Sequence, residues 1–136
     1  MSDSPDVAEL CLELGYPVTV EQVEERLTEI TSDPDHVALV AESEDGRVVG
    51  WVHVHGSKLL LSSPRAEIGG LVVAAECRRR GVGRALMVAA EGWARDKGYG
   101  GIRVRSNVIR SDAHDFYRGL DYSSTKRSHV FEKVLG

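Results

Sequence analysis

Two periods of hydrophobic and polar residues alternate along the chain and predict its helices and strands. Segments in which apolar residues recur every three or four positions predict helices over residues 5–14, 20–30, 83–97 and 111–120. Segments rich in β-branched and aromatic residues predict strands over residues 36–43, 48–55, 66–74, 101–106 and 128–135. The order is two helices, a β-hairpin and then a β-α-β-α-β arrangement, which predicts a mixed α/β fold.

Short polar motifs mark where several of these elements begin, turn or bend. Residues 19–22 (TVEQ) form a capping box that opens the second helix, and Gly98 is placed to end the helix over residues 83–97. Residues 44–47 (EDGR) are a turn signal between the first two strands, and residues 62–64 (SSP) are typical of a loop. The adjacent glycines Gly69 and Gly70 fall inside the third strand, where they predict a bulge or a close backbone approach.

Length and composition favour a single soluble domain over residues 1–136. The longest apolar run, residues 85–90, is too short to cross a bilayer, and the N-terminus lacks the basic and apolar regions of a signal peptide. Cys11 and Cys77 are not spaced as metal ligands, so we expect free thiols, no metal and a cytoplasmic location. A net charge of -4 argues against a general nucleic-acid-binding protein.

The charge is nonetheless unevenly distributed, which bears on the ligands. Residues 78–110 contain nine Lys or Arg residues against two acidic residues, whereas residues 1–45 are rich in Asp and Glu. The second half is therefore suited to a local anionic ligand, and the first half is suited to a cationic one.

The sequence CRRRGVGRA, residues 77–85, joins a predicted strand to a predicted helix. The unpaired N–H groups and partial positive charge of a helix N-terminus bind phosphate, and glycines let the backbone approach it. A P-loop is excluded because Gly83 is not followed by Lys and then Ser or Thr, and a Rossmann fingerprint is excluded because Leu86 occupies the third glycine position. A glycine turn flanked by solvated arginines is the alternative to a phosphate site.

Two motifs in this order resemble those of the GNAT family of N-acetyltransferases. The first is LVVAAECRRRGVGRALM, in which residues 78–83 (RRRGVG) match an acetyl-CoA-binding signature of Arg or Gln, two residues, Gly, one residue, and Gly or Ala. The second is Asn107 followed by AHDFYRGLDY, which is similar to the family's Ala-x-x-Phe-Tyr motif. The resemblance covers about residues 66–122 and implies acetyl-CoA as the cosubstrate.

The resemblance implies a mostly antiparallel, twisted sheet in which a splayed parallel pair of strands binds acetyl-CoA. The pyrophosphate would lie on the backbone amides of residues 79–84, and the pantetheine would add as a strand beside residues 71–73. Asn107 would bind a pantetheine amide, and Tyr117 would lie near the sulfur. The implied cofactor-binding residues are Leu71, Val72, Val73, Arg78, Arg79, Arg80, Gly81, Val82, Gly83, Arg84 and Asn107.

Two departures from the family pattern alter the expected fold. The family has a strand before its first helix, which here is missing or very short, so we expect a sheet edge that is exposed or covered in a homodimer. The family's glycine before the final aromatic residue is Asp121 here. Because Asp tolerates the left-handed backbone conformation better than most residues, we expect the turn to be preserved.

Acetyl transfer needs a neutral amine, a polarised thioester and a proton for the leaving thiolate. Glu67 is the first candidate for the base, acting through water, and a cross-strand ion pair is the alternative role. Tyr117 is the candidate acid by resemblance, with core packing as the alternative. His53 and His55 share a strand face with Trp51, where they either line the acceptor pocket and relay a proton or lie on a half-exposed strand beside polar partners.

We therefore expect an N-acetyltransferase that moves the acetyl group of acetyl-CoA to a primary amine of a small cationic molecule, directly and in a ternary complex. The C-terminal sequence TKRSHVFEK is similar to that of aminoglycoside 6'-acetyltransferase-like relatives. A non-catalytic acyl-CoA-binding regulatory module is the alternative. RNA binding is disfavoured because the basic segment lacks the interleaved aromatic residues that stack on bases.

Overall fold

The computed structural model describes residues 3–13, 15–78, 80–105, 111–126 and 128–136. The chain forms two compact units, residues 1–104 and residues 105–136. The single domain expected over residues 1–136 stays a prediction.

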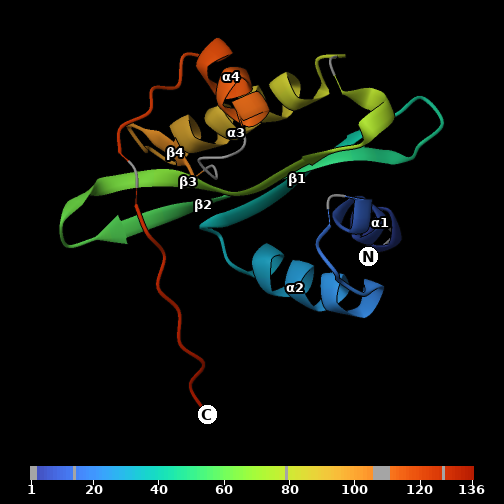
Figure 1. Ribbon diagram of the computed structural model, residues 1–136, viewed down its shortest axis with the longest axis horizontal. Coiled ribbons are helices and arrows are strands. Elements are labelled where there is room, and N and C mark those ends of the chain that lie inside the picture. The colour runs from blue at the N-terminus through green and yellow to red at the C-terminus, as the bar shows by residue number, and fades with distance from the viewer. Residues whose placement is uncertain (1–2, 14, 79, 106–110, 127) are drawn as a thin grey trace. The chain divides into compact units, whose positions relative to one another are not determined.

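The first unit contains, in its described residues, a four-stranded sheet with helices on both faces (Figure 1). Its elements are α1 (Ser4–Glu13), α2 (Val20–Ser32), β1 (His36–Glu42), β2 (Val48–Leu59), β3 (Ser62–Val73), the 3-10 helix η1 (Ala75–Cys77), α3 (Val82–Asp96) and β4 (Ile102–Val104). The strand order is β1-β2-β3-β4, in which the first two pairings are antiparallel and the last is parallel. This arrangement confirms the predicted mixed α/β class.

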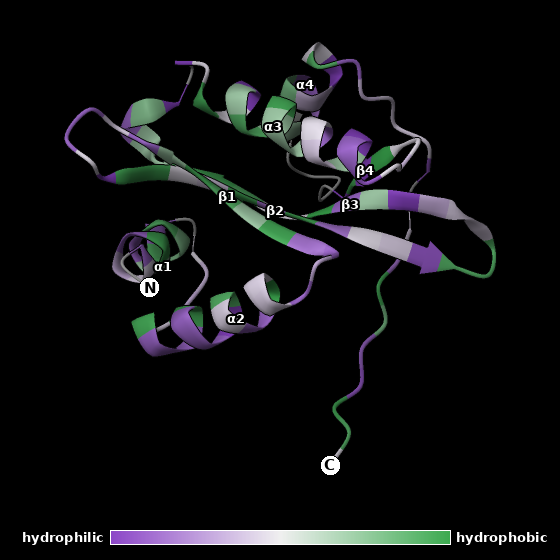
Figure 2. Ribbon diagram, turned by 180° about the vertical axis from the view of Figure 1, so that it is seen from behind, coloured by the Kyte–Doolittle hydropathy of each residue, from purple (hydrophilic) through white to green (hydrophobic). Residues whose placement is uncertain are grey.

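Different helices cover the two faces of the sheet (Figure 1). On one face, Val52 and Val54 are fully buried, and α3 approaches closely enough that a Cβ atom at Gly50 would lie 3.1 Å from the side chain of Leu86. On the opposite face, α1 and α2 pack against Val72 and its neighbours in a second hydrophobic cluster. Figure 2 shows the outer side of α2 as hydrophilic, as expected for a helix that buries a single stripe.

Local signals in the sequence predicted several boundaries correctly. The side chain of Thr19 accepts a hydrogen bond from the Gln22 amide, and the Gln22 side chain accepts one from the Thr19 amide, which confirms the capping box of α2. α3 ends before Gly98, whose φ of 87° is left-handed, as predicted for a C-terminal glycine.

The hairpin between β2 and β3 is longer than predicted. Residues 62–64 were expected to form a loop, but β2 continues to Leu59 and β3 begins at Ser62. The register of the ladder shifts between the pair Ser57–Arg65 and the pair Leu59–Ser62. Pro64 lies at this irregularity, where its missing N–H costs no ladder hydrogen bond.

The second unit contains α4 (Ser111–Gly119), followed by a turn and an irregular segment. Asp121 has a φ of 68°, which confirms the predicted left-handed turn. The strand predicted over residues 128–135 is wrong, because the described residues there form no regular structure. Phe131 and Val134 are 91% and 93% exposed. A β-rich sequence forms a strand only where a partner strand accepts its hydrogen bonds.

Candidate functional site

A β-bulge lies at Gly69, in the middle of β3. The ladder between β2 and β3 skips this residue, because His53 pairs with Gly70 and the following residue of β2 pairs with Ile68. β4 pairs with β3 at residues 66–68, immediately before the bulge. The bulge predicted from the two glycines is therefore confirmed, and the described parallel pairing ends where the strand bends.

Beyond the bulge, β3 presents backbone groups past the end of its described pairing with β4. The N–H of Ala74 donates to the carbonyl of Val49 on β2. Because backbone groups alternate sides along a strand, Leu71 and Val73 direct theirs to the opposite edge. At this edge, Nε of Arg78 donates to the carbonyl of Val73 at 3.4 Å. An extended ligand could pair with the same edge as an added strand.

The N-terminus of α3 has the backbone geometry of an anion site. Gly81 is the N-cap, with φ 83° and ψ 4°, and among the described residues no side chain caps the first turn. This left-handed backbone favours glycine. Arg80 and Arg84 are exposed beside the cap, so positive side chains and uncapped amides occur together.

The residues expected to bind the cofactor thus lie in two adjoining places, the end of β3 and the start of α3. Val72 differs from its neighbours because its side chain is buried in the cluster beneath α1 and α2. Val82 and Gly83 are half-buried in the first turn of α3. Arg79 and Asn107 lie outside the described residues.

Three imidazoles and an indole lie together on one face of the sheet. Trp51, His53 and His55 alternate along β2, and His36 of β1 pairs with His55. The ring centroid of His36 lies 5.2 Å from that of His53 and 4.9 Å from that of His55. Nδ1 of His36 lies 3.0 Å from Nε2 of His53. We refer to His36, His53 and His55 as the histidine cluster.

The glycine pair of the bulge lies directly against two of these rings. A Cβ atom at Gly69 would lie 2.5 Å from Nδ1 of His53, and one at Gly70 would lie 2.8 Å from the ring of Trp51. Real Cβ atoms essentially never approach this closely. Glycine at these positions therefore serves the packing of the aromatic face as well as the bulge.

Burial, and then the neighbouring imidazoles of His55 and His36, lower the pKa of His53 from 6.5 to about 4. Its side chain is therefore uncharged at neutral pH. Across the parallel pair, Oε1 of Glu67 lies 3.5 Å from Nε of Arg103, and both side chains are largely buried. Glu67 thus forms the ion pair considered as its alternative role, and its action as a base stays a prediction.

Tyr117 belongs to α4, in the second unit. Its ring packs edge-on against Phe116 at 5.1 Å and against Tyr122 at 6.0 Å. Its backbone carbonyl accepts hydrogen bonds from the amides of Leu120 and Tyr122, which close the turn after the helix. These contacts fix the ring locally, and proton donation by the hydroxyl stays a prediction.

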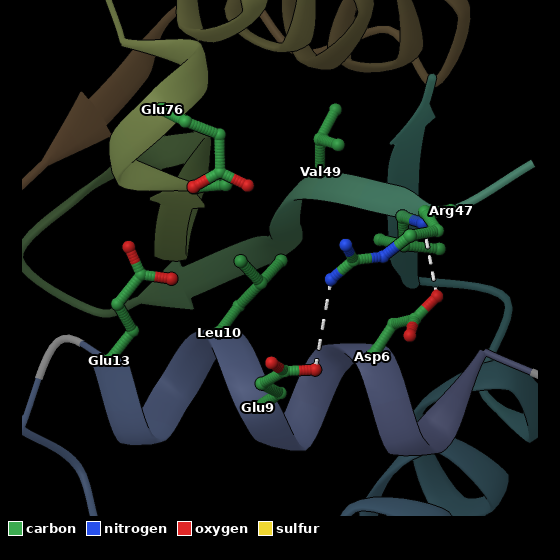
Figure 3. Close-up of a pocket in the computed structure, with 9 residues that line it drawn as sticks. Asp6, Glu9, Leu10, Glu13, Arg47, Val49 and Glu76 are labelled. Carbon is green, nitrogen blue, oxygen red and sulfur yellow. Dashed lines mark hydrogen bonds and ion pairs between the residues drawn. The ribbon is translucent and has the colours of Figure 1, made fainter. Parts of the chain in front are cut away.

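A separate pocket of about 230 Å³ lies between α1 and the ends of β2 and β3. Figure 3 shows carboxylates of α1 and Glu76 directed into it. The carboxylate of Asp6 accepts a hydrogen bond from the Val48 amide, and Glu13 accepts one from the Ala75 amide. Glu9 lies 3.9 Å from Arg47. These contacts tie α1 to the sheet, so we assign the carboxylates a structural role.

One residue of the aromatic face, His36, was not identified from the sequence. It joins the cluster only through its pairing with His55, and its Nε2 lies 3.8 Å from Oδ2 of Asp33. The three imidazoles stack instead of converging on a point. In the described part of the chain, no group of three or more His, Cys, Asp or Glu side chains could hold a metal ion. No described helix is long and apolar enough to span a membrane.

Known proteins are similar to this chain in both sequence and fold. Residues 6–122 match the acetyltransferase (GNAT) family. The chain is 30% identical over 131 residues to aminoglycoside N(6')-acetyltransferase type 1 of Stenotrophomonas maltophilia, covering 91% of this chain and 84% of that protein. It is 26% identical over 117 residues to the Serratia marcescens enzyme of the same name, covering 81% and 78%.

Solved structures of low sequence identity have the same fold. AAC(6')-Iy in complex with a bisubstrate analogue, CoA-S-monomethyl-acetylneamine, superposes with a TM-score of 0.86 at 18% identity over 98% of this chain and 93% of that one. Aminoglycoside 6'-N-acetyltransferase AAC(6')-Ih of Acinetobacter baumannii gives 0.82 at 21% identity over 99% and 94%. With the family match over most of its length, the chain belongs to the acetyltransferase (GNAT) family and is an acetyl-CoA-dependent N-acetyltransferase.

Proposed function

We propose that this enzyme transfers the acetyl group of acetyl-CoA directly to a primary amine of a small cationic molecule, with both substrates bound in one ternary complex. Leu71 and Val73 would pair with the pantetheine through their backbone groups. The amides of residues 80–84, with the side chains of Arg78, Arg80 and Arg84, would bind the pyrophosphate. By resemblance, Arg79 would also contact the pyrophosphate, and Asn107 would bind a pantetheine amide.

The observation that carries this proposal is the continuity of the segment from Gly69 to Arg84. It offers first a strand edge that extends past the described β4 pairing, and then an exposed helix N-terminus capped by Gly81. A ligand that is extended at one end and anionic at the other matches this order. The thioester then lies toward Gly69, because the diphosphate occupies the other end of the segment.

The charge distribution and the names of the relatives support a small cationic acceptor. Residues 1–45 contain thirteen Asp or Glu residues and one basic residue, Arg26. Such a surface attracts cations and raises their local concentration. The matching enzymes of Stenotrophomonas maltophilia and Serratia marcescens are named for aminoglycosides, which carry several amines.

In this reaction the amine nitrogen attacks the thioester carbonyl carbon, and the thiolate of CoA leaves. A base would remove a proton from this nitrogen, for which Glu67 acting through water is the candidate from the sequence, and Tyr117 would protonate the departing sulfur. The role of Tyr117 rests on resemblance to the family, and that of Glu67 rests on its place in the strand that enters the bulge.

The test measures binding and turnover separately. Millimolar CoA or acetyl-CoA should raise the melting temperature, because a ligand that binds only the folded state stabilises it. A panel of small polyamines and aminoglycosides should then release free thiol from acetyl-CoA. Folded protein with no shift at millimolar CoA contradicts the cofactor site. A shift without thiol release for any amine would support the non-catalytic alternative instead.

A further inference from the structure

The histidine cluster lies where the proposed thioester would end. The ring of His53 covers the bulge residue Gly69, with Nδ1 as its closest atom to the Cβ position. The described parallel pairing of β3 ends one residue earlier, at Ile68. Among the described residues no group hydrogen-bonds with Nδ1, whereas Nε2 faces His36 at 3.0 Å. One ring nitrogen is therefore turned toward the bulge and the other toward a second imidazole.

A carboxylate at the far end of this pair determines how the protons are arranged. Oδ2 of Asp33 lies 3.8 Å from Nε2 of His36, and its other oxygen accepts a hydrogen bond from the Asp35 amide. The carboxylate favours the tautomer of His36 that carries its proton on Nε2. Nδ1 of His36 is then an acceptor, so His53 donates from Nε2. In a neutral ring this leaves Nδ1 of His53 unprotonated.

We propose that His53 is the group that accepts the proton from the acceptor amine, and that His36 and Asp33 are positioning residues that orient it and conduct the proton to solvent. This assignment rests on the proposed function, because it places the thioester at the bulge. It assigns to His53 the role of base for which Glu67 was the candidate from the sequence, because the Glu67 carboxylate forms the ion pair with Arg103.

The lone pair of the amine forms the C–N bond to the carbonyl carbon, and the nitrogen becomes cationic. It loses one proton to Nδ1 of His53, while the Nε2 proton of His53 moves to His36 and the Nε2 proton of His36 passes to water beside Asp33. The C–S bond breaks, and the sulfur keeps its electron pair and takes a proton from Tyr117 or water. The products are the amide and CoA thiol.

The surroundings of His53 suit a base that takes the proton only after the amine has attacked the carbonyl carbon. The low pKa of His53 keeps the ring neutral and ready to accept a proton at neutral pH. A base this weak does not deprotonate a free ammonium ion, but it matches a nitrogen that has become acidic by bonding to the carbonyl carbon. The charged and titratable groups around the cluster are Asp33, His36, His55, Glu67 and Arg103. The side chain of Asp33 is 51% exposed, which opens the far end of the chain to water.

The decisive variant is His53→Gln, whose amide retains a polar group at the Nε2 position but places no basic nitrogen at Nδ1. We expect kcat to fall by roughly 10²–10⁴-fold, the usual scale for general acid–base catalysis. The thermal shift with CoA and the KM for the amine should change by less than about twofold, because neither depends on the proton acceptor. His36→Gln and Asp33→Asn should each lower kcat by roughly tenfold or more through loss of the orienting tautomer.

Two further measurements distinguish a role of Asp33 in orienting the imidazoles from a role in the fold alone. Nitrogen NMR of labelled protein should show His53 protonated on Nε2 alone, and Asp33→Asn should mix the two tautomers. Glu44→Gln is the matched control, since it removes one exposed carboxylate at the other end of β1, and it should leave kcat unchanged.

If His53→Gln binds CoA and retains kcat within threefold, the proposal is overturned and the proton goes to Glu67 or water. If that variant does not fold, Asp33→Asn decides, and an unchanged kcat with an unchanged NMR tautomer overturns the proposal. Failure of the parent protein to bind CoA would instead remove the proposed function on which it rests.

Discussion

The ring of Tyr117 packs against two aromatic neighbours, so its hydroxyl can be removed without removing the packing. If the hydroxyl protonates the departing thiolate, Tyr117→Phe should lower kcat/KM for a slow amine by roughly 10²–10⁴-fold. CoA should bind almost as before, because the ring is kept. The measurement is steady-state kinetics with the thermal shift as a binding control. A variant within twofold of the parent would make Tyr117 a packing residue.

His53 should also make folding stability depend on pH. Its pKa is about 4 in the folded chain and 6.5 ordinarily, so between these values the unfolded chain binds more protons. Stability should therefore be complete above pH 6.5 and fall as the pH drops toward 4. The loss from this residue should be about 1–2 kcal/mol after allowance for solvent screening of a partly exposed ring. Denaturant unfolding of the parent and of His53→Gln, from pH 7 to pH 4, checks this. Parallel curves for the two proteins would contradict it.

At the scale of elements, the start of α3 separates folding from binding. Gly81 has a φ of 83°, and a Cβ atom there would meet nothing within 4 Å. The folding cost of Gly81→Val is therefore backbone strain of about 1–2 kcal/mol. The loss of amide contacts to the diphosphate should weaken CoA binding by about 10–100-fold. Gly81→Asn is the control, because Asn tolerates the left-handed backbone and should keep most of the stability and affinity. Calorimetric titration with CoA measures the affinity of both variants. Equal affinity in the valine variant and the parent would remove the diphosphate from this site.

Elements with strong local signals were predictable from the sequence, and elements defined by a partner were not. The capping box of α2 and the glycine after α3 act within a few residues, so pattern reading found them. The extension of β2 to Leu59 and of β3 from Ser62 depends on cross-strand pairing, which overrides the loop character of SSP. The predicted final strand failed for the opposite reason, since the described structure provides it with no partner.

The register of β1 shows why His36 was not identified from the sequence. The β1–β2 ladder shifts by one residue between Ala41 and Glu42. Counting back from the hairpin turn without that shift places His36 opposite Val54, on the other face of the sheet. With the shift, His36 pairs with His55 and completes the cluster. The bulge at Gly69, by contrast, was marked by two adjacent glycines and could be predicted.

At the scale of the whole molecule, β1 is the strand through which two copies could assemble, because it forms one edge of the described sheet. The carbonyl of Asp35 accepts from the Gly56 amide on β2, so alternation directs the backbone groups of Ala38 and Val40 outward. Such an edge is a template for pairing with a second copy. We predict a homodimer at micromolar concentration, with a mass of twice 14.9 kDa by light scattering.

The dimer prediction has a matched pair of variants. Val40→Pro removes an outward N–H without touching the ladder to β2, and it should yield the monomer mass with the fold retained. Val40→Ala keeps the N–H and should stay dimeric. A monomeric parent protein at micromolar concentration would exclude this assembly.

The contact between His53 and Gly69 also has an evolutionary consequence. The imidazole fills the volume that any side chain at position 69 would need, so a lineage that acquires alanine there while it keeps the histidine must displace the imidazole or the strand. Replacement of His53 by a smaller residue removes this barrier. If position 69 changes first, its new side chain clashes with the imidazole. Among descendants of a common ancestor, side chains at position 69 should therefore occur only in branches that already carry a smaller residue at position 53. An alignment of relatives that breaks this order would show that the strand can shift to relieve the contact.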